Sequence, residues 1–387
     1  MTGQHDLVVI GAGIHGVGVA QAAAAAGHSV LVLEQSGVAC ATSCRSSKLI
    51  HGGLRYLESG QFNLVRESLR ERDILLRIAP QLVRLVPFHI PVYRHTARRP
   101  WQIRAGLSLY AVLGNLRRHA WFAALPRAQW GDLDGLATQN LQAVFRYQDA
   151  QTDDAALTQA VMRSAQSLGA ELVVPGEFLA AQRTANGYAV RYRTPQGEAE
   201  SHCTALVNAA GPWINTVLAR ITPRVPPAAI ELVQGTHVVL DGPLQRGVYY
   251  TEAEDGRAVL VMPWRNMTLV GTTETSFSGD PAQVRPQTAE EEYLLRTFRR
   301  YFPDRAVQVR DRFAGLRVLP FAEGAAFRRP RETIYGTDAP EQPRLVSIYG
   351  GKLTGYRATA EKVLALLAPT LPARAQRGDT RTLPLGP

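Results

Sequence analysis

The stretch DLVVIGAGIHG, residues 6–16, decides the fold of this chain. Its apolar first half is typical of a β-strand, and it runs into three glycines with the spacing G-x-G-x-x-G. Gly11 suits a tight turn, Gly13 lets the backbone approach a pyrophosphate, and Gly16 lets a helix pack closely on the strand. The N-terminus of such a helix offers free N–H groups and a positive dipole end to phosphates.

The residues that follow complete a β-α-β pattern. We expect an alanine-rich helix over residues 17–26 and a second strand over residues 29–33, which ends at Glu34. An acid at this place accepts hydrogen bonds from a ribose diol. A glycine-rich turn of an ordinary α/β domain is the alternative, but the strands, helix and acid in register favour dinucleotide binding. The pattern does not decide between FAD and NAD.

The chain has 387 residues and is basic, with 43 Lys+Arg against 33 Asp+Glu and a formal net charge of +10. This length allows two or three domains. Three cysteines without a C-x-x-C pair predict neither a disulfide framework nor a metal site, and they favour a reducing compartment. We expect no signal peptide, because the chain opens directly on the first strand, and no apolar run reaches the ~20 residues that a membrane span needs. The charge leaves an anionic substrate, an anionic membrane surface and nucleic acid open.

After Glu34 the chain continues with ATSCRSSKLIHGGLRYLE, residues 41–58. This stretch resembles the FAD-dependent glycerol-3-phosphate dehydrogenases, within the wider class of D-amino-acid-oxidase-like flavoproteins. Further blocks follow in the expected order over nearly the whole chain: DAQTDD (149–154), NAAGPW (208–213), QGTH (234–237), GTTE (271–274), GLRVLP (315–320) and GGKLTGYR (350–357). Longer members of this family carry a C-terminal helical domain, which we expect this short form to lack.

The residue patterns and the resemblance together predict an α/β fold with two domains. A discontinuous, Rossmann-like FAD-binding domain is expected over residues 1–80, 149–215 and 311–370, and a β-rich α+β substrate domain over residues 81–148 and 216–310. In the substrate domain, alternating residues predict strands at 231–240, 247–251, 258–263 and 267–271. Helices are expected at 62–78, 154–168 and 352–367, and residues 371–387 are expected to form a loose tail.

The resemblance implies FAD as the cofactor. No cysteine follows Cys203, so we expect the FAD to be non-covalent. The residues implied to bind it are Gly11, Gly13, Ile14, His15, Gly16, Glu34, Gln35, Thr42, Ser43, Ser46, Ser47, Lys48, Leu49, His51, Gly52, Ala210, Gly211, Trp213, Gly315, Arg317, Gly350, Gly351, Lys352, Leu353 and Thr354.

The resemblance also implies a reaction, the oxidation of sn-glycerol 3-phosphate to dihydroxyacetone phosphate by hydride transfer to flavin N5, with electrons passed to a quinone or another acceptor. A flavin oxidase that uses O₂, or a dehydrogenase of another hydroxy or amino acid, is the alternative. A phosphate needs cationic anchors. The implied substrate-binding residues are Arg55, Tyr56, Lys352 and Thr354, and the implied catalytic residues are Arg317 and a base, for which we prefer His237 to His51.

One departure from the family concerns this substrate assignment. Thr354-Gly355-Tyr356 stands where many relatives have two threonines before the tyrosine. Gly355 removes a hydroxyl near the implied phosphate site, which weakens the case for glycerol 3-phosphate itself.

Residues 94–119 combine arginines with aromatic and aliphatic residues. Such a segment suits contact with anionic lipid, and the alternative is a helix packed on the substrate domain. We therefore expect a cytoplasmic protein that can lie peripherally on the inner face of the cytoplasmic membrane. Nucleic acid is not expected, because the arginines are scattered and no aromatic–basic stripe is present. Homodimer formation is left open.

Overall fold

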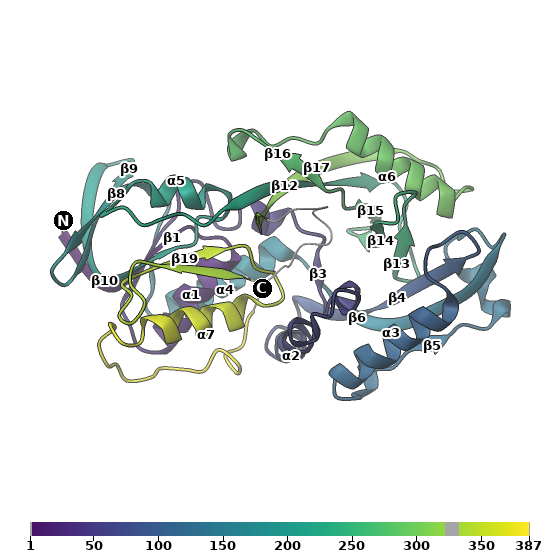
Figure 1. Ribbon diagram of the computed structural model, residues 1–387, viewed down its shortest axis with the longest axis horizontal. Helices are drawn as coiled ribbons and strands as arrows, with labels where there is room; N and C mark the ends of the chain where they lie inside the picture. The colour runs from purple at the N-terminus through teal and green to yellow at the C-terminus, as the bar shows by residue number, and fades with distance from the viewer. Residues whose placement is uncertain (1, 322–332, 387) are drawn as a thin grey trace.

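The computed structural model describes residues 2–321 and 333–386, and two β-sheets organise them (Figure 1). Among these residues the first sheet has nine strands in the order β11-β8-β9-β10-β1-β2-β7, with β19 beside β10 and β18 beside β19. Its strands are β1 (Thr2–Ile10), β2 (Val30–Leu33), β7 (Glu171–Val173), β8 (Glu177–Thr184), β9 (Gly187–Thr194), β10 (Gly197–Asn208), β11 (Ile221–Thr222), β18 (Ile334–Thr337) and β19 (Leu345–Tyr349).

The centre of the first sheet is parallel and follows the predicted β-α-β unit. β1 pairs in parallel with β2 on one side and with β10 on the other, and β19 continues in parallel beside β10. The helices α1 (Ile14–Ala25), α4 (Asp154–Ser167) and α7 (Tyr356–Leu367) pack together beside these strands. Because the carboxyl ends of parallel strands meet at one edge, the loops after β1, β10 and β19 lie together there.

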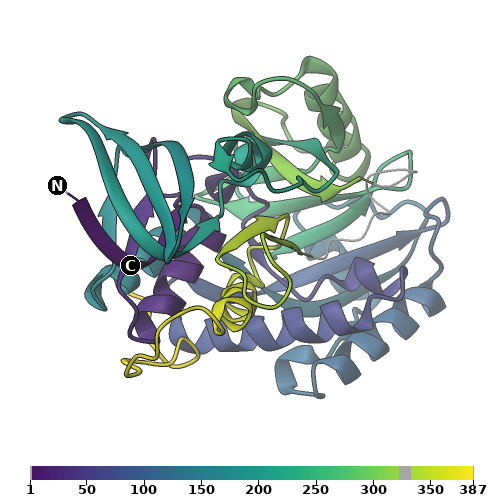
Figure 2. The same ribbon diagram turned by 60° about the vertical axis from the view of Figure 1, so that its left-hand side comes forward.

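The second sheet has ten strands among the described residues. Their order is β16-β12-β15-β14-β13-β4-β6-β3, with β17 beside β12 and β5 beside β6. The strands are β3 (Leu49–Ile50), β4 (Val83–Tyr93), β5 (Ala123–Ala124), β6 (Leu141–Thr152), β12 (Ile230–Leu240), β13 (Val248–Glu252), β14 (Ala258–Trp264), β15 (Met267–Gly271), β16 (Thr275–Phe277) and β17 (Val309–Pro320). The remaining helices are α2 (Phe62–Ile78), α3 (Pro100–Leu113), α5 (Ile214–Leu218) and α6 (Thr288–Tyr301). Figure 2 shows the two sheets as separate halves of the molecule.

Most of the predicted elements are present within a residue or two of their expected ends. The four strands expected in the substrate domain are β12 to β15, and α2 has the predicted bounds. The helix expected from residue 352 instead begins at Tyr356, because Gly350 and Gly351 have φ values of +75° and +99° and form a loop ahead of it. Residues 311–320, expected in the FAD-binding domain, belong to β17 and pair with β12 of the second sheet.

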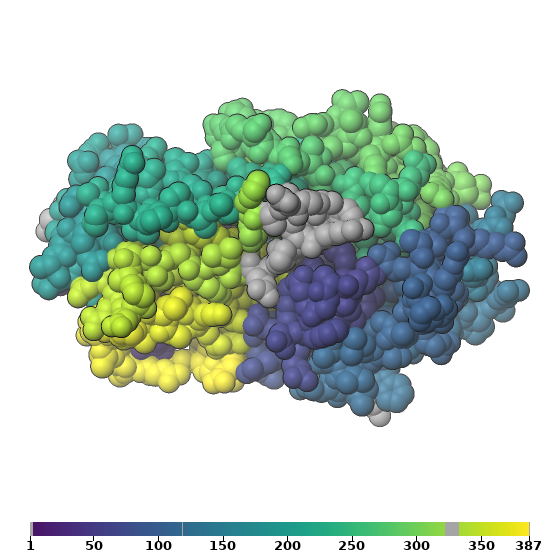
Figure 3. Space-filling view, in the orientation of Figure 1, coloured from purple at the N-terminus to yellow at the C-terminus, as the bar shows by residue number. Residues whose placement is uncertain are grey.

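The C-terminal segment differs from the loose tail that we expected. Residues 371–386 contain neither helix nor strand, yet they lie against the first sheet and its helices (Figure 3). The Leu385 side chain is only 3% exposed and belongs to the core around β1 and α1. Arg374 forms an ion pair with Asp6, with a closest N–O distance of 2.7 Å. The apolar contact and the ion pair hold a segment whose composition alone predicts mobility.

Candidate active site

A cavity of about 340 Å³ lies where the carboxyl edge of the first sheet meets the second sheet. Gly13, Ala209 and Gly350, which follow β1, β10 and β19, line one part of it. Leu260 of β14 and Arg317 of β17 line another part. The site is therefore shared between the two sheets.

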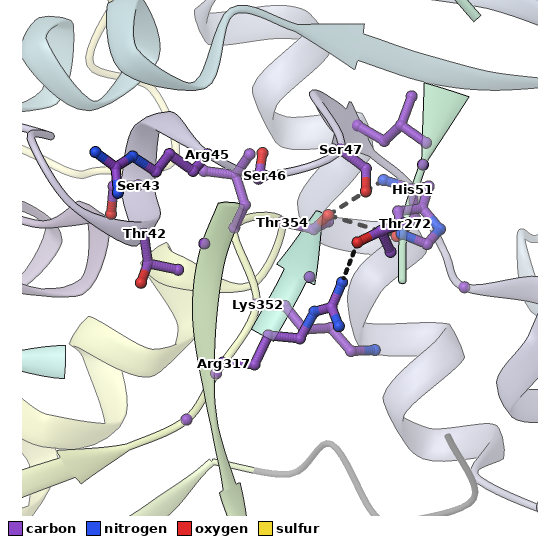
Figure 4. Close-up of a pocket in the computed structure, with 18 of the residues that line it drawn as sticks. Thr42, Ser43, Arg45, Ser46, Ser47, His51, Thr272, Arg317, Lys352 and Thr354 are labelled. Carbon is purple, nitrogen blue, oxygen red and sulfur yellow. Dashed lines mark hydrogen bonds between the residues drawn. The ribbon is translucent and has the colours of Figure 1, made fainter. Parts of the chain in front are cut away.

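The cavity brings together most of the residues that the sequence singled out. Among the predicted site residues, its lining includes Gly13, Ile14, His15, Thr42, Ser43, Ser46, Ser47, Leu49, His51, Arg55, Tyr56, Gly211, His237, Gly315, Arg317, Gly350, Gly351, Lys352, Leu353 and Thr354 (Figure 4). The predicted residues outside the lining are Gly11, Gly16, Glu34, Gln35, Lys48, Gly52, Ala210 and Trp213.

The glycine-rich turn has the geometry that a pyrophosphate requires. Gly11 has a φ of +99°, and a Cβ there would lie 2.7 Å from the Ala209 carbonyl oxygen. A Cβ at Gly16 would lie 1.9 Å from the Gly11 carbonyl oxygen, so only glycine lets the helix start this close to the turn. The first turn of α1 carries no acidic residue. A helix N-terminus without negative side chains fits the phosphates of a dinucleotide.

Glu34 stands at the end of β2 and organises the turn next to it. Its carboxylate accepts hydrogen bonds from the backbone N–H groups of Ala12, Ser36 and Gly37 at 2.8, 2.9 and 3.3 Å. Glu34 thus ties the glycine-rich turn to the loop that follows β2. Its position matches the acid of dinucleotide-binding folds, so the residues present fit the adenosine end of FAD.

The loop from Thr42 to Lys48 crosses from the first sheet to the second. The Thr42 hydroxyl donates to the Leu316 carbonyl at 2.7 Å, and the Ser43 hydroxyl accepts the Ile14 N–H at 2.8 Å. Ser43 therefore lies at the start of α1, where the phosphates are expected. These contacts place the hydroxyl groups of the loop along the cavity.

The side chain of Lys48, a predicted cofactor ligand, lies outside the cavity lining. Its side chain is 5% exposed, and Nζ donates to Asp154 Oδ1 at 2.7 Å and to the Cys44 carbonyl at 2.5 Å. Asp154 is fully buried and also accepts the Ser46 N–H and hydroxyl at 2.9 and 2.6 Å. The lysine charge is therefore neutralised within the protein, where it holds this loop on the first turn of α4.

Three predicted cations lie in the cavity wall. The Lys352 Nζ lies 3.7 Å from the centroid of the Tyr56 ring, and the Arg55 guanidinium carbon lies 5.5 Å from the same centroid. Arg317 donates to the Thr272 hydroxyl at 2.9 Å and to the Thr273 carbonyl at 3.3 Å (Figure 4).

The Glu274 carboxylate, which the sequence analysis did not single out, links two of these cations. Its Oε1 lies 3.9 Å from Arg55 and 3.6 Å from Arg317, and it also lines the cavity. It belongs to the GTTE block, but nothing in its local pattern distinguishes it from a surface acid.

The two candidate bases are both held neutral. Burial is the main cause that lowers the pKa of His51 to about 4, and the nearby positive charges of Lys352 and Arg55 lower it further, while Asp149 opposes them. Burial also lowers the pKa of His237 well below its usual value, with contributions from Arg317 and Lys48. A neutral imidazole can accept a proton, so either residue has the required protonation state at neutral pH.

The surroundings of the two histidines differ. His237 is 1% exposed, stacks on the Phe313 ring at 4.9 Å, and places Nε2 3.0 Å from the Ser47 hydroxyl. His51 is partly exposed, and its backbone N–H donates to the Thr354 hydroxyl at 3.1 Å.

A buried polar chain behind His51 escaped the sequence analysis. The Tyr110 hydroxyl of α3 accepts the Gly52 N–H at 2.9 Å and donates to Asp149 Oδ2 at 2.6 Å. Asp149 Oδ1 accepts from the fully buried Arg72 at 2.8 Å. A tyrosine on a helical apolar face normally indicates core packing, so sequence alone gave no signal for this contact.

The comparisons with known proteins agree with this architecture. Residues 6–358 match the FAD-dependent oxidoreductase family. The chain belongs to this family, and it is an FAD-dependent oxidoreductase, as the sequence blocks predicted.

Its relatives include phospho-alcohol dehydrogenases. The chain is 37% identical over 376 residues to the glycerol-3-phosphate dehydrogenase of Pseudomonas aeruginosa, covering 94% of this chain and 72% of that one. It is 33% identical over 369 residues to the D-erythritol 1-phosphate dehydrogenase of Brucella abortus, covering 92% and 72%. The crystal structure of the glycerol-3-phosphate dehydrogenase from Bacillus halodurans complexed with FAD superposes with a TM-score of 0.74 at 26% identity, over 99% of this chain and 68% of that one.

Proposed function

We propose that this chain oxidises sn-glycerol 3-phosphate, or a closely related phospho-alcohol, to the corresponding ketone, which is dihydroxyacetone phosphate for glycerol 3-phosphate. We propose a quinone as the final electron acceptor. The observation that carries the substrate class is the pairing of Arg55 and Lys352 around Tyr56 in the cavity wall. The relatives named glycerol-3-phosphate dehydrogenase support the same choice.

Each part of the substrate has a complementary group in the cavity. Arg55 offers a planar fork and Lys352 a compact charge, and together they suit a phosphate dianion. Arg317 can donate hydrogen bonds to the substrate oxygen that becomes the carbonyl oxygen of the product. Phosphate binding then fixes the reacting carbon, so that binding energy from a remote group lowers the barrier. The FAD, when bound, supplies the hydride acceptor.

The structure shifts our preference for the base from His237 to His51. His51 lines the cavity together with Arg55 and Lys352, the groups proposed to hold the phosphate of the substrate. The His237 Nε2 already contacts the Ser47 hydroxyl, and the ring is almost fully buried. We therefore propose that His51 takes the hydroxyl proton and that His237 holds the loop from Thr42 to Lys48 through Ser47.

Anaerobic mixing of the purified FAD-loaded protein with a panel of compounds tests this function. The panel contains sn-glycerol 3-phosphate, erythritol phosphate, glycerol, glycine and proline, and the readout is loss of the oxidised flavin absorbance. We expect rapid reduction by a phosphorylated alcohol and none by glycerol or the amino acids. Reduction by an amino acid alone would refute the proposal, and peroxide formation in air would replace the quinone with O₂.

Two matched pairs of variants test the residue roles. Arg55→Gln should raise the dissociation constant of inorganic phosphate by about 10-fold or more, because it removes one of two charged anchors, whereas Arg66→Gln on the exposed face of α2 should leave it unchanged. His51→Gln should lower the flavin reduction rate by about 10² to 10⁴, the usual contribution of a general base, while phosphate still binds. A larger loss in His237→Gln than in His51→Gln would reverse our assignment.

The Gly355 departure does not alter the cavity lining. Gly355 is not among the residues that line it, and a Cβ there would meet nothing closer than Glu67 Oε1 at 3.8 Å. We therefore propose that Gly355 leaves the phosphate anchors intact. Gly355→Thr should change the preference between glycerol 3-phosphate and erythritol phosphate by less than about 3-fold.

We further propose that α3 and the segment after it contact an anionic membrane surface. Trp101, Val112, Leu116 and Trp121 are 70%, 56%, 58% and 66% exposed, and arginines lie among them in the sequence. Within residues 2–321 and 333–386, no helix is both long and apolar enough to cross a bilayer. The protein should sediment together with phosphatidylglycerol vesicles. The double variant with Trp101→Ser and Trp121→Ser should stay in the supernatant. Equal sedimentation with neutral vesicles would contradict the role of charge.

A further inference from the structure

Glu290, in the first turn of α6, is a buried carboxylate with an unusually complete set of donors. The residue is only 5% exposed. Oε1 accepts the hydroxyls of Thr273 and Thr275, both at 2.8 Å. Oε2 accepts the Gln234 side-chain amide and the Thr236 hydroxyl, both at 2.6 Å, and the Gln287 N–H at 3.2 Å.

These donors keep the carboxylate ionised. Burial by itself would raise the pKa of Glu290, but the hydrogen bonds from Thr236, Thr273 and Thr275 outweigh it and lower the pKa below its usual value. A helix N-terminal capping box needs one such acceptor contact, with the N-cap backbone. Four further donors, from β12 and from the segment after β15, exceed what a cap requires.

The same segments hold Arg317. The Thr236 N–H donates to the Thr273 hydroxyl at 2.8 Å, which joins the segment after β15 to β12. Arg317 donates to the Thr272 hydroxyl at 2.9 Å and to the Thr273 carbonyl at 3.3 Å. Its guanidinium crosses β12 at Gly235, where a Cβ would lie 2.5 Å from the nearer nitrogen. The position of the guanidinium therefore depends on how this segment is fixed.

We propose that Glu290 is a positioning residue that fixes the Thr272–Thr275 segment, and through it aims the Arg317 guanidinium at the substrate oxygen. Glu290 does not line the cavity and acts through Thr273. This inference rests on the proposed function, because it takes Arg317 as the group that binds the reacting oxygen.

Glu290→Gln tests the proposal. The amide nitrogen donates where a carboxylate oxygen accepted, so the hydroxyls on that side must turn and the segment must shift. A displacement of about 1 Å costs about 10²-fold in rate, so we expect flavin reduction at saturating substrate to slow by about 10- to 100-fold. The dissociation constant of inorganic phosphate, which Arg55 and Lys352 determine, should change by less than about 3-fold. Glu292→Gln, an exposed acid on the same helix, should change neither.

The linking residue supplies a second, independent pair of variants. Thr273→Val removes the hydroxyl that reaches Glu290, and Thr273→Ser keeps it. We expect Thr273→Val to behave like Glu290→Gln, and Thr273→Ser to retain flavin reduction within about 3-fold of the parent. Equal losses in the valine and serine variants would overturn the proposal.

A double-mutant cycle separates positioning from a general loss of stability. In an Arg317→Lys background, Glu290→Gln should slow flavin reduction by less than about 3-fold, because the group that it positions has already been replaced. An undiminished loss of about 10- to 100-fold in that background would show that Glu290 acts elsewhere.

A crystal structure of Glu290→Gln makes the test independent of any substrate. We expect the distance between Arg317 and the Thr272 hydroxyl to exceed about 3.5 Å, beyond hydrogen-bond reach, and an unchanged distance would refute the inference. If glycerol 3-phosphate does not reduce the parent flavin, the proposed function fails, but this distance still decides the role of Glu290.

Discussion

The buried Lys48–Asp154 ion pair leads to a prediction that separates a structural lysine from a cofactor ligand. In Lys48→Met, Asp154 stays fully buried and keeps three donor contacts, the Ser46 N–H, the Ser46 hydroxyl and the Ala155 N–H. Removing one partner of a buried pair costs about 3–5 kcal/mol. Because these donors still stabilise the carboxylate, we expect the lower end, about 3 kcal/mol.

This loss of free energy is large enough to measure as a thermal shift. In a domain of about 150–250 residues, 1 kcal/mol moves the unfolding midpoint by about 2–4 °C, so Lys48→Met should lower it by about 6–12 °C. Lys48→Met with Asp154→Asn should recover part of the loss, because no unpaired charge is then buried. Lys362→Met, at an exposed position of α7, makes the same chemical change and should shift the midpoint by less than about 2 °C.

Calorimetry of the FAD-loaded and FAD-free protein at one scan rate is the assay. The reasoning predicts a similar shift in both forms, because the ion pair supports the loop whether or not FAD is bound. If Lys48→Met weakened FAD binding by about 10-fold or more but left the midpoint of the FAD-free protein unchanged, Lys48 would be a direct ligand and our structural interpretation would be wrong.

Three further predictions concern other parts of the molecule. His89 is 3% exposed, and burial is the main cause that lowers its pKa to about 4, so the unfolded chain binds more protons than the folded one between about pH 6.5 and 4. When the pH is lowered through this range, the unfolding temperature of His89→Phe, measured by calorimetry, should therefore fall less than that of the parent. Tyr110→Phe removes the hydroxyl that contacts the Gly52 N–H and Asp149, so the free energy of unfolding should fall by about 1–3 kcal/mol by calorimetry and flavin reduction should slow. An unchanged rate of flavin reduction would show that these contacts do not affect the reaction. Gly235→Ala places a methyl group 2.5 Å from the Arg317 guanidinium, so stopped-flow measurements should show flavin reduction slowed by about 10- to 100-fold while phosphate still binds. A rate equal to that of the parent would mean that the guanidinium can move aside without loss of function.

The sequence predicts the parts of this structure that depend on local patterns. The turn after β1 could be predicted because only glycine tolerates a φ of +99° at Gly11 and the close contact at Gly16. The four strands β12 to β15 could be predicted from alternation. The resemblance supplied the residues in the cavity wall, and the structure brings most of them together.

The parts that could not be predicted depend on contacts between distant residues. The pairing of β17 with β12 could not be predicted because a local pattern gives a strand but not its partner. The ion pair of Lys48 with Asp154 could not be predicted because it joins residues 106 positions apart. Glu290 was unnoticed because a capping box explains an acid at the start of a helix, and its contact with Thr236 spans 54 positions. In each case the contact depends on which distant segments the tertiary fold brings together.

The pairing order of the first sheet has a consequence for how the chain folds during synthesis. β1 is made first and lies at the centre of the sheet, but its neighbour β10 begins only at Gly197, and β19 begins at Leu345. The α1 helix likewise packs on α7, which begins only at Tyr356. The nucleotide-binding half therefore cannot close until the chain as far as α7 has left the ribosome. Until then the apolar faces of β1 and α1 depend on transient protection, so synthesis rate and chaperones should affect the yield of this protein more than that of a domain built from consecutive segments.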